Sequence, residues 1–76
     1  MTRLPSVTAM EAVRALERAG FKAVRTSGSH QRFVHAENPS LATTVPMHSG
    51  TTLKRGTLRN IIKQAGLTVD DFVSLL

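Results

Sequence analysis

Apolar residues near the beginning of the chain recur at the spacing of one helical face. Thr8 stands before this stretch and Glu11 follows three residues later, which is the capping-box pattern that starts a helix. Gly20 suits a left-handed C-terminal position, after which Phe21 can fold back onto Leu16. The sequence therefore predicts a helix between Thr8 and Gly20, with an apolar stripe made of Ala9, Ala12, Val13, Leu16 and Ala19.

The helical period is absent between Lys22 and Met47. Short runs with β-branched or aromatic residues are separated there by turn-forming residues, at positions 27–29 and 37–40. Short connections favour antiparallel pairing of neighbouring strands. The pattern predicts an antiparallel meander of three strands, from Lys22 to Thr26, His30 to His35 and Leu41 to Met47.

Strand alternation predicts which side chains share a face of this sheet. The residues expected to point into the core are Val24, Phe33 and Val45. The residues expected on the opposite face are then Ala23, Arg25, His30 and Arg32. The same alternation places Val34 outside, which is a cost for an apolar side chain.

Two more helices are expected after the strands. The second runs from about Lys54 to Ala65 and is followed by Gly66 as a C-cap, with an apolar stripe made of Leu58, Ile61, Ile62 and Ala65. The last one starts with Thr68 as N-cap and has Asp70 and Asp71 in its first turn, where carboxylates favour the helix dipole. The side chains expected to anchor it are Phe72, Leu75 and Leu76.

This order of elements predicts an α+β fold in a single domain that spans residues 1–76. The order is α-β-β-β-α with a short C-terminal helix, and the economical arrangement places the helices on one face of the three-stranded antiparallel sheet. A chain of 76 residues leaves room for one modest core.

Charge and cysteine content narrow the function classes. Ten Lys and Arg residues face five Asp and Glu residues, for a net charge of +5, so a polyanionic partner is plausible. The absence of cysteine excludes disulfides and thiolate zinc sites and fits a reducing cytoplasm, and no apolar run is long enough for a membrane span. The basic residues that we expect to hold nucleic-acid phosphates are Lys22, Arg25, Arg32, Lys54 and Arg55.

His30 is the best candidate for catalysis, because it follows Gly28 and Ser29 at the start of a predicted strand. Glycine there permits close approach of a ligand to the backbone, and imidazole, which titrates near pH 6.5 in model peptides, can accept or donate a proton in RNA cleavage. A hairpin histidine that only bonds its own turn is the plainer alternative. His48 is the second candidate, whereas His35 is expected at the surface.

A metal site made of the three histidines is a weaker interpretation. The spacing of His30, His35 and His48 matches no zinc pattern, and no carboxylate stands beside them. His30 and His35 would also point to opposite faces of one strand. We therefore expect no metal and no small-molecule cofactor.

A series of short motifs in order closely resembles the HicA (YcfA-like) family over nearly the whole chain. Besides Arg25, the matching segments are Ala19-Gly20-Phe21, Gly28-Ser29-His30, Val45-Pro46-Met47-His48, residues 53–67 and Asp71-Phe72. The resemblance implies a fold related to double-stranded RNA-binding domains. It also implies an mRNA interferase of a bacterial toxin-antitoxin system, neutralised by a HicB-type antitoxin, with Gly28 and His30 as functional residues. The loop from Ala36 to Leu41 is slightly longer than is usual in the family.

Two other function classes stay open at this point. A non-catalytic module of double-stranded RNA-binding type would have the same fold and charge. A DNA-binding protein or an adaptor could use the exposed side of the second helix, which carries Arg59, Asn60, Lys63 and Gln64.

Overall fold

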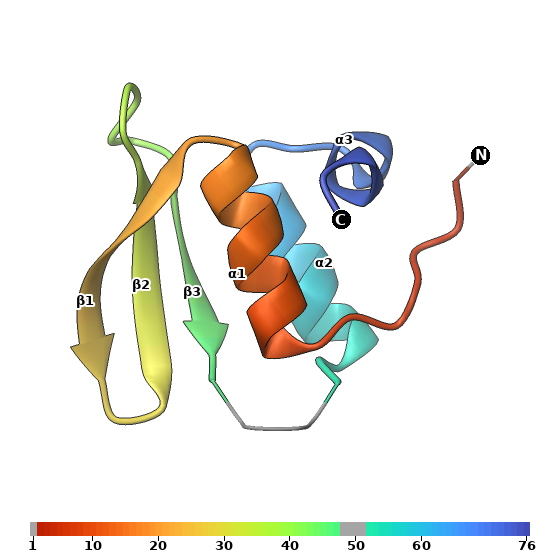
Figure 1. Cartoon of the computed structure of the whole chain (residues 1–76), viewed down its shortest axis with the longest axis horizontal. Coiled ribbons are helices and arrows are strands. Elements are labelled where there is room, and N and C mark those ends of the chain that lie inside the picture. The colour runs from red at the N-terminus through yellow and green to blue at the C-terminus, as the bar shows by residue number, and fades with distance from the viewer. Residues whose placement is uncertain (1, 48–51) are drawn as a thin grey trace.

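The sheet and the helices occur in the predicted order. The structure is a computed structural model that describes residues 2–47 and 52–76. The elements are α1 (Ala9–Arg18), β1 (Phe21–Ser27), β2 (His30–His35), β3 (Ala42–Pro46), α2 (Arg55–Gln64) and α3 (Val69–Ser74). β1 and β3 both pair antiparallel with the central β2 (Figure 1). The α+β class and the meander are thus confirmed, with helix and strand ends within a residue or two of the prediction.

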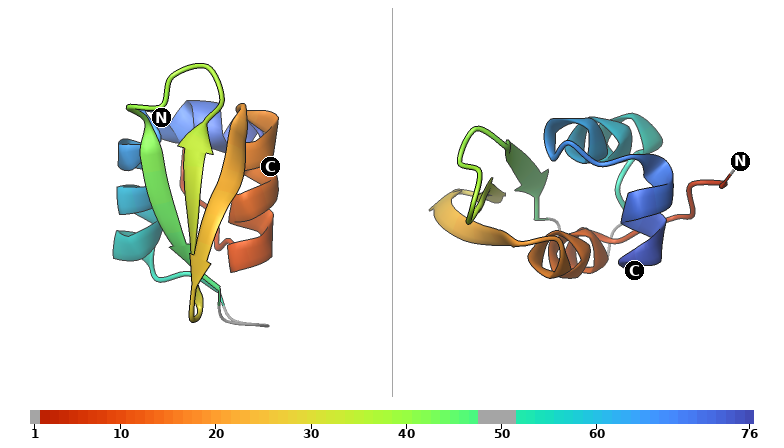
Figure 2. Two further views of the ribbon diagram at one scale, coloured as in Figure 1. Left: turned by 90° about the vertical axis from the view of Figure 1, so that its left-hand side faces the viewer. Right: turned by 90° about the horizontal axis from the view of Figure 1, so that it is seen from above.

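The described chain forms three layers. The sheet is the first layer, α1 and α2 form the second, and α3 lies on the far side of these two helices together with the N-terminal segment (Figure 2). The segment before α1 is fixed at its end, because Thr8 pairs with Thr52 and the Leu53 N–H donates to the Val7 carbonyl at 2.8 Å. Both helices therefore cover one face of the sheet and leave its other face open.

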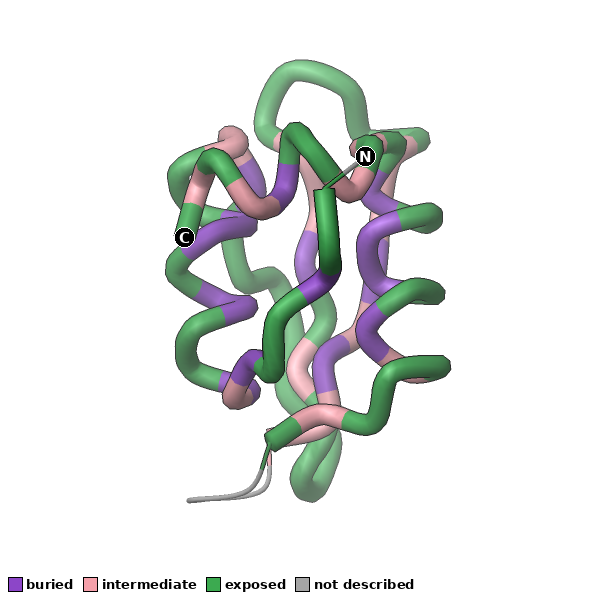
Figure 3. The backbone as a smooth tube through the Cα atoms, turned by 90° about the vertical axis from the view of Figure 1, so that its right-hand side faces the viewer, coloured by how far each residue is buried: buried purple, intermediate pink, exposed green. Residues whose placement is uncertain are grey.

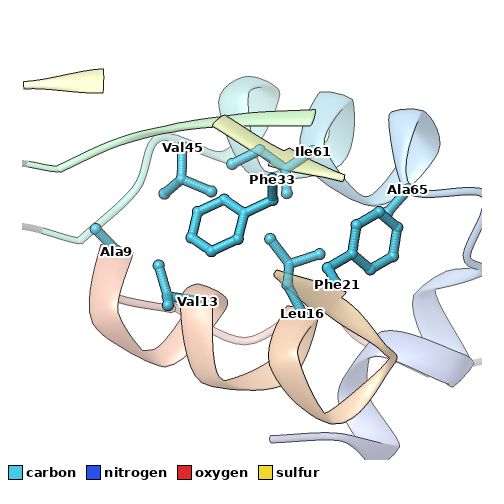
Figure 4. Packing of buried hydrophobic residues seen from close by; sticks show 8 residues of the cluster. All are labelled: Ala9, Val13, Leu16, Phe21, Phe33, Val45, Ile61 and Ala65. Carbon is cyan, nitrogen blue, oxygen red and sulfur yellow. The ribbon is translucent and has the colours of Figure 1, made fainter. Parts of the chain in front are cut away.

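The main core lies between the sheet and the two long helices. Phe33, at the middle of β2, is fully buried and is surrounded by side chains from both helices (Figure 4). The cluster consists of Ala9, Val13, Leu16, Phe21, Phe33, Val45, Ile61 and Ala65. Each large side chain here contributes about 1.5–3 kcal/mol by leaving water. This burial fixes the positions of α1 and α2 against the sheet.

A second core lies on the other side of α1 and α2. It consists of Leu4, Val7, Ala12, Ala15, Leu58, Ile62 and Phe72. Figure 3 shows the result: the helices carry buried positions toward the interior and exposed ones toward solvent. Phe72 is the anchor of α3, with Leu75 partly buried beside it, whereas Leu76 is 45% exposed and the prediction that it anchors the helix is wrong.

The helix ends follow the predicted signals. Both bonds of the capping box at Thr8 and Glu11 are present, and Thr68 and Asp71 repeat the box at α3. After α2, Gly66 has a φ of 73°, its N–H donates to the Lys63 carbonyl, and the Leu67 N–H donates to the Ile62 carbonyl. These two bonds make a Schellman ending, so the sequence signals at these positions describe the actual caps.

The face assignment of β1 is the main correction to the sequence analysis. The register shifts between Ala23 and Arg25, so Ala23 pairs with the core residue Phe33 but is itself exposed, while Arg25 pairs with Arg32 on the open face. Val24 lies within this bulge and is 53% exposed rather than in the core. A bulge adds one residue to one strand, and simple alternation cannot anticipate it.

Candidate functional site

A tight hairpin between β1 and β2 holds His30 in place. Ser27 pairs with His30, so Gly28 and Ser29 form a two-residue loop, and Gly28 alone has a positive φ, 58°. Glycine with positive φ at the first loop position is typical of a type II′ turn, whose twist matches paired strands. His30 also pairs with Pro46, and the Ser29 carbonyl accepts a hydrogen bond from the Met47 N–H. The backbone of His30 is thus fixed from both sides, and its side chain is exposed.

The His30 side chain opens into a groove beside the β3 edge of the sheet. The groove has a volume of about 750 Å³ and lies where α2 runs next to β3, as both views in Figure 2 show. Thr43 and Val45 of β3 are buried in the core, so the alternating residues Ala42, Thr44 and Pro46 point away from it and line the groove. Its lining consists of His30, Arg32, Ala42, Thr44, Pro46, Thr52, Leu53, Lys54, Thr57, Asn60, Ile61 and Gln64.

The groove is basic. Two cations, Arg32 and Lys54, line it with His30, and none of its described lining residues is acidic. The Arg32 Nη1 donates to the Thr44 hydroxyl at 3.2 Å, which directs the guanidinium toward β3. Lys54 is the N-cap of α2 and makes no side-chain cap bond, so the positive end of the α2 dipole adds to the charge at this end of the groove.

The remaining predicted basic residues divide into two groups. Lys22 and Arg25 lie on the open face of the sheet, opposite Val34 and Arg32 respectively, and extend the basic surface away from the groove. Arg55 does not join them, because its Nη1 donates to the Leu4 carbonyl at 3.0 Å and ties the N-terminal segment to α2. His48 lies outside the described residues.

His35 has a structural role, which corrects its predicted surface position. Its Nε2 bonds the Ala19 carbonyl at 3.1 Å, and its Nδ1 accepts from the N–H groups of Glu37 and Asn38 at 3.1 and 3.2 Å. These partners require the tautomer that carries the proton on Nε2. The ring also meets Phe21 edge-on, with centroids 5.1 Å apart. His35 therefore faces away from His30 and cannot share a ligand with it.

The α2 side of the groove was missing from the predicted site. Thr57, Asn60 and Gln64 line it at helical spacing, and the buried Thr43 hydroxyl donates to the Gln64 Oε1 at 2.9 Å. The signal in the sequence was the exposed polar stripe that includes Asn60 and Gln64, which we considered only for contact with DNA. Without the packing of α2 beside β3, nothing connected this stripe with His30.

Fold and groove together define a class: a small α-β-β-β-α domain, consistent with the double-stranded RNA-binding type, with a basic groove beside an exposed histidine. Residues 9–67 match the HicA toxin family of bacterial toxin-antitoxin systems. The match covers well over half of the chain, so the chain belongs to this family of toxins, and an antitoxin partner follows from membership. A comparison with curated proteins gave no match. Within the described residues, no helix is long and apolar enough to cross a membrane.

Proposed function

We propose that this toxin is an endoribonuclease, an mRNA interferase, in which His30 transfers a proton during cleavage. One observation carries the proposal: the exposed His30 opens into a groove whose described lining includes Arg32 and Lys54 but no acidic residue. An RNA strand in this groove has its phosphates next to cations and its ribose next to an imidazole. Cleavage of mRNA stops translation, which fits a toxin that inhibits growth.

The proposed reaction needs only proton transfers. The ribose 2′-oxygen attacks the adjacent phosphorus, a base takes the 2′-proton, and an acid protonates the departing 5′-oxygen, which leaves a 2′,3′-cyclic phosphate and a 5′-hydroxyl. Imidazole can serve as the base or as the acid. The reaction is independent of metal, because Mg²⁺ usually needs one or two carboxylates and the described groove lining offers none.

We propose His48 as the second group that transfers a proton, on the basis of its position in the sequence. His48 directly follows Met47, whose N–H donates to the Ser29 carbonyl next to His30. Gly28 and Ser29 support the site by forming the turn that fixes His30.

The phosphates are held by a basic surface that runs from the groove onto the open face of the sheet. Arg32 and Lys54 act inside the groove, and Lys22 and Arg25 act on the sheet. Arg55 is the least supported of the five predicted contacts, because an RNA phosphate would compete with the Leu4 carbonyl for its guanidinium. Losing one phosphate contact weakens binding at all sequences and reduces its salt dependence.

The antitoxin partner is proposed to be a HicB-type protein that covers the groove, in the bacterial cytoplasm where both act. A basic groove attracts an acidic surface and speeds its docking. The same contact excludes RNA, so inhibition would be steric. A complex that leaves His30 open to an RNA strand would contradict this part of the proposal.

The function is tested by the variant His30→Ala expressed in bacteria without antitoxin. We expect growth inhibition to disappear while the melting temperature stays within a few degrees, because the His30 side chain is exposed. Arg14→Ala, an exposed change on α1, is the control and should stay toxic. Full toxicity of a folded His30→Ala protein would contradict the catalytic role. Loss of RNA cleavage without loss of RNA binding separates the enzyme from a purely RNA-binding module.

A further inference from the structure

We propose that the end of the groove around Gln64 is a subsite for one unpaired nucleobase that presents a carbonyl oxygen. The inference rests on the proposed ribonuclease function and deepens it, because it names a residue that discriminates between substrates. It concerns the α2 wall of the groove, at the end away from His30.

The Gln64 side chain is held in one orientation by a buried partner. Thr43 is fully buried, and its hydroxyl donates to the Gln64 Oε1 at 2.9 Å. The opposite amide orientation would leave the hydroxyl hydrogen of Thr43 without an acceptor among the described residues, at a cost of about 1–3 kcal/mol. The two N–H groups of the Gln64 amide are therefore left as donors for a ligand, and Gln64 lines the groove.

The surroundings of Gln64 suit a base better than a phosphate. The apolar residues at this end of the groove are Ala42 and Ile61, and Asn60 lies one helical turn before Gln64. None of these four residues carries a charge. A flat base can contact the partly exposed Ala42 while the amide bonds its edge, whereas phosphates bind at the cations and at His30.

The distance between the two ends of the groove places this base near the cleaved bond at His30 but not next to it. His30 pairs with Pro46 at one end of β3, and Ala42 lies at the other end, four residue steps away. At about 3.3 Å per residue, the separation is about 13 Å. The subsite would thus hold a base a few nucleotides along the strand from the cleaved bond.

The two N–H donors of the Gln64 amide determine which base this subsite can bind. Two donors match the carbonyl oxygens that uracil presents at C4 and guanine at C6, whereas adenine and cytosine carry an amino group at the corresponding position. In an A-form duplex these edges lie in a deep, narrow groove that side chains cannot read. The ligand is therefore an unpaired base with a carbonyl oxygen, which excludes adenine; uridine and guanosine present that oxygen at the edge described above, and cytidine presents it only at O2.

The test is RNA binding in a His30→Ala background, so that cleavage does not interfere. The probes are a fluorescent octamer of uridine, an octamer of adenosine and an RNA duplex of 16 base pairs, each titrated by anisotropy. One well-placed base contact contributes about 1–3 kcal/mol, so we expect the uridine octamer to bind about tenfold tighter than the adenosine octamer. The duplex should bind more weakly than the uridine octamer.

Two variants identify the residue responsible. Gln64→Glu keeps an acceptor for the Thr43 hydroxyl but removes both donors, and Thr43→Val with Gln64→Leu removes the polar pair together. Both should reduce the uridine-to-adenosine ratio to near one, and Lys63→Ala, an exposed neighbour on α2, should leave it unchanged. The ratio is the readout because the added charge of Gln64→Glu lowers affinity for any RNA.

Three results would overturn the subsite: equal binding of the two octamers by the parent protein, a uridine preference that survives both Gln64 variants, or duplex binding as tight as that of the uridine octamer. None of these touches the nuclease proposal, which fails instead if the His30→Ala protein still cleaves RNA.

Discussion

Gly20 shows how a single position joins α1, the sheet and the loop after β2. Its φ is 101°, a conformation that other residues rarely adopt, and a Cβ at this position would lie 2.8 Å from the His35 Nε2. His35 cannot move aside easily, because three hydrogen bonds hold its ring. The turn thus depends on glycine for both conformation and space.

We predict that Gly20→Ala lowers the free energy of unfolding by about 2 kcal/mol or more, as expected for a strained backbone with a clash. Gly56→Ala is the matched control, because Gly56 lies in α2 and a Cβ there would meet nothing within 4 Å. The control should be neutral or stabilising by up to about 1 kcal/mol. Urea unfolding measures both, and equal stability of the two variants would contradict this account of Gly20.

The residue scale also shows what the sequence could not reveal about the histidines. Strand alternation, with Phe33 in the core, correctly predicted that His30 is exposed on the opposite face. His35 follows two residues after Phe33 on the core side of β2, yet its three hydrogen-bond partners lie in the α1 ending and in the loop after β2. Strand alternation already placed His35 on the same face as Phe33, but its hydrogen-bond partners come from distant segments with no local signal, so His35 was mistaken for a surface residue.

At the scale of elements, the helix caps gave the most reliable predictions, above all the capping box of Thr8 and Glu11. The Thr8 N–H donates to the Glu11 Oε1 at 2.8 Å, and the Glu11 N–H donates to the Thr8 hydroxyl oxygen at 3.1 Å. The hydrogen bond from the Thr8 backbone N–H, with help from its side chain, holds the pKa of the Glu11 carboxyl below its ordinary value of 4.5. Such local signals are readable because every participant lies within four residues.

The cap should therefore weaken in acid. A lowered pKa means that Glu11 contributes stability above pH 4.5, and that this contribution is lost as the pH falls through the lowered value. We expect Glu11→Gln to be less stable than the parent at pH 7, and we expect this difference in stability to vanish once the pH is below the lowered pKa of Glu11. Thermal unfolding from pH 7 to 2.5 measures it, and a difference independent of pH would contradict the charged cap.

The bulge in β1 brings two cations together on the open face of the sheet. Arg25 and Arg32 occupy directly opposite positions, and like charges in such pairs destabilise a sheet. From the sequence, we assumed that the apolar Val24 faces the core and alternated the other residues of β1 from it. Only the structure shows that Val24 is exposed within a bulge. This cost is understandable if the open face binds the phosphates of an RNA strand, as proposed above.

Arg25→Thr should therefore stabilise the fold while weakening RNA binding. We expect a gain of about 0.5 kcal/mol in low salt, which shrinks in 1 M NaCl as screening removes the repulsion. Lys22→Thr is the control, because Lys22 faces Val34 and its loss relieves no like charge. Urea unfolding at both salt concentrations tests this, and a loss of stability in Arg25→Thr would argue against the repulsion.

At the scale of the whole molecule, the groove follows from the way α2 packs. Ile61 belongs to the main core and also lines the groove, so the burial that fixes α2 against the sheet also places Asn60 and Gln64 in the wall of the groove that contains His30 and Arg32. The sequence predicted the apolar stripe of α2 but not the neighbouring strand, because periodicity says which side is buried and not against what. The sequence thus identified His30, Arg32 and Lys54 as candidate site residues, but it did not indicate that Thr57, Asn60 and Gln64 of α2 line the same groove.

The central claim is that His30 drives metal-independent cleavage through the ribose 2′-hydroxyl. The direct measurement incubates purified toxin, and the His30→Ala variant, with a short RNA in excess EDTA and with the same RNA carrying a 2′-deoxy sugar at the cut site. We expect the toxin to cut the RNA and leave a 2′,3′-cyclic phosphate, and to leave the deoxy substrate intact, while His30→Ala cuts neither. Cleavage abolished by EDTA, cleavage of the deoxy substrate, or cleavage by His30→Ala would contradict the account.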